Sequence, residues 1–149
     1  MKKALARKSG VFLLLVALIF VFAAGAEAER QGFGNFEIYV PYGWTVERSN
    51  VQATFMAPEN VAALSIIVDT ATGTTAEEVA RDLSGTHGGT TPEAVEEGTF
   101  MFSFQNEGGV HSTAIVVRMD DADLYMIWVI AGEHPQLGDL IESFQWIDE

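Results

Sequence analysis

Apolar and polar residues alternate along most of the chain after residue 35. Phe100, Phe102 and Phe104, for example, are separated by Met101 and Ser103. A period of two is typical of β-strands, because successive side chains of a strand point to opposite faces. Short turns join most of the alternating segments, which favours antiparallel pairing between neighbours. The pattern predicts strands at 36–40, 44–47, 51–55, 62–69, 99–105, 110–119 and 124–131.

Two helices are predicted among these strands. The first begins at Thr75, because Thr75 and Glu78 have the spacing of a capping box, and it is expected to end at Gly85. The second begins with Pro135, since proline is favoured at the first helical position. Its apolar residues have the spacing of one helical face and are Leu137, Leu140, Ile141 and Phe144.

The strands at 62–69 and 124–131 are apolar on both sides. Both faces of the sheet that contains them must therefore be covered, and a helix on each face would do so. The predicted fold class is α+β. It consists of an antiparallel sheet of about six to seven strands sandwiched between helices, in the order ββββ-α-βββ-α.

The first residues have the pattern of an export signal. Four basic residues lie within 1–10, an apolar run fills 11–22, and small-x-small cleavage patterns occur at 24–26 and 26–28. Together they predict a secretory signal peptide at 1–28. The alternative is an uncleaved anchor, but the apolar stretch of about 16 residues is shorter than the roughly 20 that span a bilayer.

After cleavage we expect no stable membrane span, because no later apolar stretch is long enough. We expect a flexible lead-in at 29–35, which is polar and contains glycine. A single domain then fills 36–147.

Charge and composition exclude several classes of protein. The chain has 149 residues, no cysteine, 21 acidic residues, 8 basic residues and a formal charge of −13. Removal of 1–28 takes away four basic residues and one acidic residue and leaves a charge of about −16. Such a domain lacks the basic surface that nucleic-acid binding requires. The absence of cysteine excludes disulfides, cysteine nucleophiles and a lipid-anchored cysteine.

The sequence contains no motif for catalysis or for a cofactor. His87, His111 and His134 have no partner at metal-binding spacing, and we expect them in solvated loops or at caps. Serine, histidine and aspartate are present, but no nucleophile elbow accompanies them. We therefore expect no enzyme and no cofactor, and a hydrolase of unfamiliar type is the catalytic alternative.

Two groups of residues are weak candidates for binding. Asp120, Asp121 and Asp123 concentrate carboxylates, as a calcium site requires, but the register of an EF-hand is missing and aspartate is also common in hairpin turns. Tyr42 and Trp44 lie at a turn and could form an exposed apolar patch for a partner. The alternative is that Trp44 packs in the core, where large apolar residues usually lie.

The segment 36–44, a strand followed by Pro41-x-Gly43-Trp44, resembles the opening of the PsbP-like superfamily. That group includes the photosystem II protein PsbP, DcrB-like envelope proteins of bacteria and a yeast Ran-binding release factor. The similarity continues in the order of elements over nearly all of the chain after the leader. The resemblance implies an antiparallel sheet between helices and a non-enzymatic accessory role, usually the binding of another protein. It implies no common catalytic site.

Two functions of different classes follow. The first is an exported, non-enzymatic accessory or binding protein of the cell envelope, periplasmic or extracellular, whose partner is another envelope protein or complex. The alternative is an acidic envelope protein that binds divalent cations or is adapted to salt, because the chain has such an excess of carboxylates.

Overall fold

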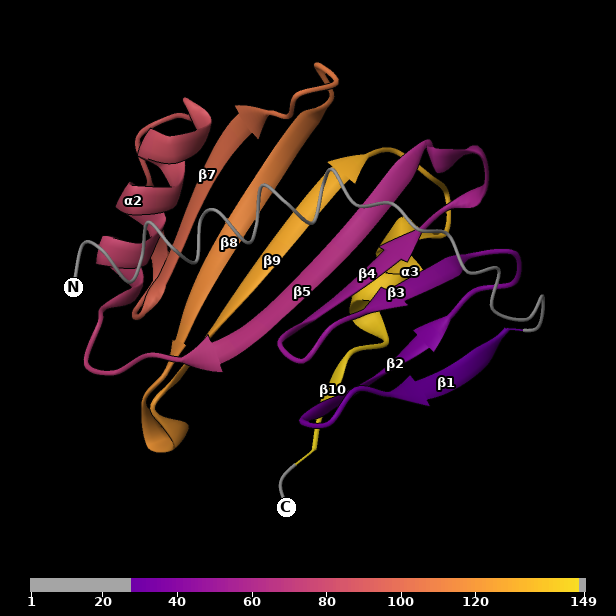
Figure 1. The fold of residues 1–149 in the computed structure, drawn as a ribbon, viewed down its shortest axis with the longest axis horizontal. Coiled ribbons are helices and arrows are strands. Elements are labelled where there is room, and N and C mark those ends of the chain that lie inside the picture. The colour runs from indigo at the N-terminus through magenta and orange to yellow at the C-terminus, as the bar shows by residue number, and fades with distance from the viewer. Residues whose placement is uncertain (1–27, 148–149) are drawn as a thin grey trace.

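The computed structural model describes residues 28–147, and Figure 1 shows how they fold. The predicted signal peptide lies outside the described residues, apart from Ala28. The main sheet is built from β3 Thr45–Arg48, β4 Gln52–Met56, β5 Ala62–Thr70, β6 Glu93–Glu96, β7 Thr99–Gln105, β8 His111–Met119 and β9 Leu124–Gly132. These seven strands pair antiparallel throughout, in the order β3-β4-β5-β9-β8-β7-β6.

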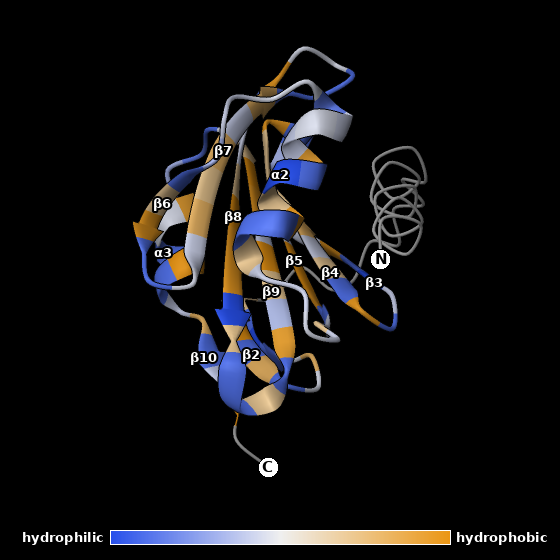
Figure 2. Cartoon of the chain, turned by 90° about the vertical axis from the view of Figure 1, so that its left-hand side faces the viewer, coloured by the Kyte–Doolittle hydropathy of each residue, from blue (hydrophilic) through white to orange (hydrophobic). Residues whose placement is uncertain are grey.

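A small sheet and two helices cover the main sheet. The remaining elements are β1 Glu29–Gly32, β2 Phe36–Val40, β10 Gln145–Trp146, α2 Ala76–His87, α3 Leu137–Glu142 and two 3-10 helices, Pro58–Asn60 and Asp120–Ala122. The strands β1, β2 and β10 form the three-stranded small sheet. Helix α2 packs on β7 and β8, whereas α3 lies against β2 and β5. Figure 2 shows α2 and α3 on opposite sides of the main sheet.

Each side of the main sheet has its own hydrophobic core. Under α2, Val79 and Phe102 belong to one cluster of buried side chains, which also receives Ile67 from β5. On the other side, Ile38 of the small sheet and Leu64 of β5 belong to a second cluster. One face of β5 is thus buried under the small sheet and α3, whereas the other face is buried at Ile67 and only partly buried at Ala63 and Ser65. The prediction that both faces are covered is correct for the first face and only in part for the second. An α+β fold with a mainly antiparallel sheet is confirmed.

The strand at 36–40 exists as predicted, but β2 leaves the main sheet. Strand β2 ends at Val40, because the next residue, Pro41, has no N–H to donate and Gly43 adopts a φ of +80°. The main sheet nevertheless has seven strands, since residues 93–96, which lie outside the predicted strands, form β6 at its edge. All four residues of β6 are exposed. A strand with no buried face has no alternation of apolar and polar residues by which its sequence could be identified.

Residues 29–32 differ from the flexible lead-in predicted for them. They form β1, which pairs antiparallel with β2 and places Arg30 opposite Tyr39. The Arg30 guanidinium also lies 3.8 Å from the Glu37 carboxylate and donates to the Ser143 carbonyl. These partners come from other parts of the chain, and the polar composition of the segment could not reveal them.

The capping box of the first helix is present as predicted, with Thr75 accepting from the Glu78 N–H. The helix passes through Gly85 and ends at Gly88, whose φ of 62° is the left-handed conformation of a helix C-cap. The second helix begins later than predicted, at Leu137 rather than Pro135, and spans only six residues. Within residues 28–147, no helix has both the length and the hydrophobicity needed to cross a membrane.

Candidate functional site

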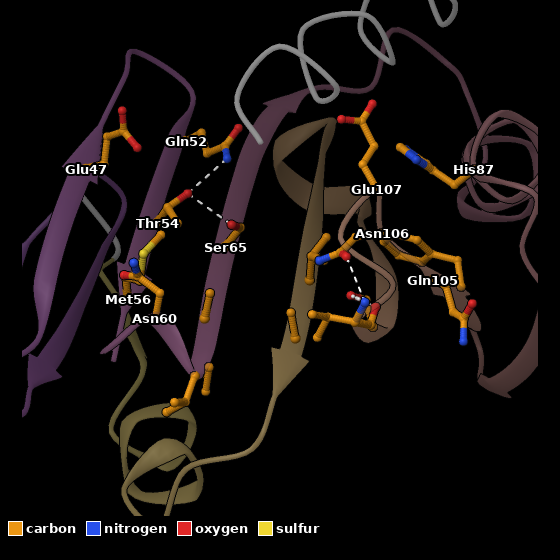
Figure 3. Close-up of a pocket in the computed structure, with 18 of the residues that line it drawn as sticks. Glu47, Gln52, Thr54, Met56, Asn60, Ser65, His87, Gln105, Asn106 and Glu107 are labelled. Carbon is orange, nitrogen blue, oxygen red and sulfur yellow. Dashed lines mark hydrogen bonds between the residues drawn. The ribbon is translucent and has the colours of Figure 1, made fainter. Parts of the chain in front are cut away.

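Helix α2 covers only part of its side of the main sheet, and a pocket of about 440 Å³ lies beside the end of the helix. The close-up in Figure 3 shows the pocket and ten labelled residues that line it. Strands β3, β4 and β5 form one wall, and the end of α2 and the hairpin between β7 and β8 form the other. The volume is within the range of roughly 300–1,000 Å³ that is typical of small-molecule sites.

Small side chains make the floor of the pocket. The strand register places Ser112, Ala131 and Ala63 side by side across β8, β9 and β5, between the larger Phe104 and Met56. All five line the pocket. Because the three central side chains are short and neither α2 nor α3 covers them, the surface of the sheet is concave at this point.

One end of the pocket is closed by the segment that leads into β5. Strand β9 ends at Gly132, which has a φ of +69°. A Cβ atom at this position would collide with the carbonyl oxygen of Val61, which lines the pocket. Only glycine therefore allows the two segments to approach this closely.

A row of hydrogen-bonded polar side chains runs along one wall. The Gln52 Nε2 donates to the Thr54 Oγ1 at 3.0 Å, and the Thr54 Oγ1 lies 3.0 Å from the Ser65 Oγ. Gln52 is only 9% exposed, and its Oε1 is buried with no hydrogen-bond partner among the described residues. A buried carbonyl left unpaired costs about 1–3 kcal/mol. The Gln52 side chain thus lines the wall of the pocket with its carbonyl oxygen enclosed in the wall.

His87 and Glu107 form the opposite wall (Figure 3). His87 is the last residue of α2, and its ring lies 5.0 Å from the ring of Phe104. Burial lowers the pKa of His87 below 6.5, and the nearby charge of Glu107 opposes this shift only in part. His87 is therefore mainly neutral at pH 7. The hairpin is fixed by Asn106, whose Oδ1 accepts from the Val110 N–H at 2.9 Å.

The charges around the pocket have one sign. Glu47 and Glu107 contribute carboxylates from opposite walls, and the described lining residues include neither lysine nor arginine. The hydroxyls of Thr54 and Ser65 engage each other, and His87 lies across the pocket from them. This arrangement is suited to binding and does not place a base beside a nucleophile.

The structure separates the two residues predicted as a possible partner-binding patch. Trp44 is only 2% exposed, and its Nε1 donates to the Gln136 Oε1 at 3.3 Å. The Trp44 ring also meets the ring of His134 edge-on at 5.3 Å. Tyr42, in contrast, is 66% exposed. The core alternative for Trp44 is thus confirmed, and Tyr42 alone remains on the surface.

The acidic turn at 120–123 is engaged by an arginine. The Arg118 Nη2 lies 2.8 Å from the Asp123 Oδ1, and its Nε lies 3.6 Å from the Asp120 Oδ1. Its Nη1 donates to the carbonyls of Met119 and Leu124. The guanidinium already neutralises part of the charge that a cation would need. Within residues 28–147, no cluster of three or more histidine, cysteine or acidic groups is arranged to hold a metal ion.

The sequence did not identify the pocket. His87 was expected in a solvated loop but forms part of the pocket wall, whereas His111 is exposed at the start of β8. Thr54 and Ser65 are polar residues within neighbouring predicted strands, which is a usable signal. Their contact depends on the register that places them opposite each other, and one sequence does not supply that register.

Solved structures are similar to this chain. No protein-family model matches it, and no curated protein matches it significantly. The Saccharomyces cerevisiae Ran-binding protein Mog1p matches with a TM-score of 0.52 and 12% identity, over 83% of this chain and 97% of Mog1p. A single-residue variant of Mog1 matches with a TM-score of 0.52 and 14% identity, over 82% of this chain and 97% of the other.

A cyanobacterial protein gives a similar result. The cyanobacterial PsbP protein CyanoP of a Synechocystis species matches with a TM-score of 0.51 and 14% identity, over 88% of this chain and 99% of CyanoP. At such identities the matches establish the arrangement of the elements and nothing finer. The resemblance seen in the sequence is confirmed at this level, and the chain has the Mog1/PsbP-like fold.

Proposed function

We propose that the protein is an exported, non-enzymatic accessory or binding protein of the cell envelope, and that it binds its partner or ligand through the pocket beside α2. The observation that carries this proposal is the pocket of about 440 Å³ itself, which has a floor of small side chains, whereas the core under α2 fills the neighbouring part of this side of the sheet. A concave site of this size with a few polar side chains in its walls is the usual form of a binding site.

Export is supported by the sequence of residues 1–28, and a binding role by the fold. The yeast protein with this fold is a Ran-binding protein. A common fold does not transfer a partner, so the proposal rests on the pocket itself.

Site-specific photocrosslinking in the cells that produce the protein tests this proposal. A photoreactive amino acid replaces Glu107 at the pocket rim or, as a matched control, Glu142 on α3 at the opposite side of the sheet. Both glutamates are exposed, so neither replacement should disturb folding. We expect a discrete adduct in the envelope fraction from position 107 and none from 142. Equal labelling at the two positions, or an adduct only from 142, would contradict the assignment of the pocket.

A further inference from the structure

The segment that follows the predicted leader is held more firmly than its sequence suggests. We propose that the leader is cut after Ala26, and that strand β1 is a lock on this processing site: once β1 pairs with β2, the bond after Ala28 can no longer be cut. This inference rests on the export of the protein, which is part of the proposed function. It does not depend on the pocket.

Two peptide bonds have the small residues that removal of a leader requires. One joins Ala26 to Glu27, and the other joins Ala28 to Glu29. Ala26 lies outside the described residues, whereas Ala28 is the first described residue and is exposed. Hydrolysis by a membrane-bound signal peptidase would add water across one of these bonds. It would leave a carboxylate on the leader and an ammonium group on the first residue of the domain.

The second bond adjoins β1 directly. Glu29 is the first residue of β1 and is paired with Val40 of β2. A backbone that is held in a sheet must be released before a peptidase can act on it, so the rate of cleavage follows the population of the open form. The first bond lies two residues further from the sheet. Pairing of β1 therefore hinders the bond after Ala28 more than the bond after Ala26.

Arginine side chains hold β1 in place. The Arg48 guanidinium of β3 donates to the Gly32 carbonyl at 3.1 Å and to the Gln31 Oε1 at 2.9 Å. Arg30, within β1 itself, contacts the Glu37 carboxylate of β2 at 3.8 Å. Two of the four arginines that follow residue 28 are thus used on a strand of four residues. A domain with so few cations does not concentrate them on a segment that is meant to stay mobile.

The lock closes fully only when the end of the chain has arrived. The Arg30 guanidinium donates to the Ser143 carbonyl and to the Gln145 Oε1, each at 3.3 Å. Gln145 belongs to β10, which pairs with the other edge of β2, and Figure 1 shows these three strands together. A hairpin of two strands is marginally stable by itself, so β1 is expected to open readily until residues 143–146 have crossed the membrane. The processing site therefore stays accessible during export and is closed in the folded domain.

The position and rate of processing in the cells that produce the protein test the proposal, by intact mass and by pulse–chase labelling. We expect the domain of the parent protein to begin at Glu27. Ala24→Gln removes a small residue that only the first bond requires, and Ala28→Gln does the same for the second bond. Ala28→Gln should be cut at the parent rate. Ala24→Gln should be cut at least about fivefold more slowly, because β1 competes for the remaining bond.

Two changes in the Ala24→Gln background distinguish a lock from a bond that is a poor substrate in itself. Insertion of Glu-Gly-Ser after Ala28 keeps the residues on both sides of the bond and moves β1 away by three positions. Arg48→Gln loosens β1 and leaves the bond unaltered. Each change should raise the rate of cleavage by at least about threefold. Arg81→Gln, which removes an equal charge from α2, is the matched control and should leave the rate unchanged.

A parent domain that begins at Glu29, or processing of Ala24→Gln at the parent rate, would overturn the assignment of the site. No gain from either the insertion or Arg48→Gln would overturn the lock. In these cases the leader is still removed, so the proposed export stands. If the parent protein keeps its leader, this inference fails together with the proposed export, and the adduct from position 107 tests the pocket separately.

Discussion

The α2 side of the main sheet has two halves that share strands β5, β7, β8 and β9 but differ in character. Under α2, large apolar residues such as Phe102 and Val116 fill the space between helix and sheet. Beside the end of α2, the same face presents Gln52, Thr54 and Ser65 above a floor of small side chains. The first half contributes to the stability of the domain through one of its two hydrophobic cores. The second half contains a pocket in place of packed side chains, and the Gln52 Oε1 has no hydrogen-bond partner among the described residues. Such departures from optimal packing and pairing are typical of functional sites.

The largest expected effect comes from the closed half. Phe102 is 3% exposed in the core under α2, so Phe102→Ala should lower the free energy of unfolding by about 3–5 kcal/mol through the cavity that it leaves. Ser103→Ala, on the opposite face of β7, should cost no more than roughly 0.5 kcal/mol. Urea denaturation of both variants measures this difference. Similar losses in the two variants would mean that the core under α2 does not contribute to stability in this way.

The pocket half should respond in the opposite direction. Gln52→Leu removes the unpaired carbonyl at the loss of one hydrogen bond to Thr54, so we expect the free energy of unfolding to rise by about 1 kcal/mol. Gln145→Leu in the small sheet is the control and should have little effect. The measurement is again urea denaturation, without ligand. A clear loss of stability in Gln52→Leu would show that the side chain is already satisfied in the free protein.

The two halves should also differ in their dependence on pH, through His87 in the pocket wall. Because burial lowers the pKa of His87 in the folded protein, the unfolded chain takes up the proton first as the pH falls. Stability contributed by neutral His87 is therefore present above pH 6.5 and is lost as the pH falls from 6.5 to the lowered pKa. Thermal unfolding at pH 8 and pH 5 should show a smaller loss for His87→Gln than for the parent protein. An equal loss in both would mean that His87 is not buried in the way described.

The smallest effect concerns the charge of the whole domain and not one half. Self-repulsion of the acidic domain is screened by salt, with a Debye length near 10 Å at about 0.1 M, so the melting temperature should rise modestly with sodium chloride. Calcium and magnesium at matched ionic strength should act alike, because Arg118 already occupies the acidic turn. A calcium-selective rise that Asp121→Asn abolishes would instead favour the cation-binding alternative.

Most of the fold follows from periodicity, because a strand carries its own pattern. The alternation of Phe100, Phe102 and Phe104 and the apolar residues of β5 predicted these strands correctly. The burial of β5 was predicted correctly on one face and only in part on the other, where Ala63 and Ser65 line the pocket. Strand β6 and strand β1 were missed, since their residues are polar or exposed and gain their structure from pairing alone. The assignment of β2 to a second sheet likewise depends on contacts between distant segments.

The pocket could not be predicted from the sequence, because it too depends on contacts between distant segments. Ala63, Ala131 and Ser112 are unremarkable one by one, and they form a floor only when three strands are aligned. His87 acquires its surroundings from the hairpin that carries Glu107, some twenty residues later in the chain. The acidic turn at 120–123, in contrast, is conspicuous in the sequence and is engaged locally by Arg118.

The most direct test of the account is a chemical-shift titration by NMR of the purified protein with an extract of the envelope fraction. The account predicts saturable shifts of the Gln52 side-chain amide and the Met56 methyl group, which line the pocket, and unchanged methyl signals from Leu83 and Val116 under α2. Shifts centred on Tyr42 or on the acidic turn at 120–123, or equal shifts under α2 and in the pocket, would contradict it.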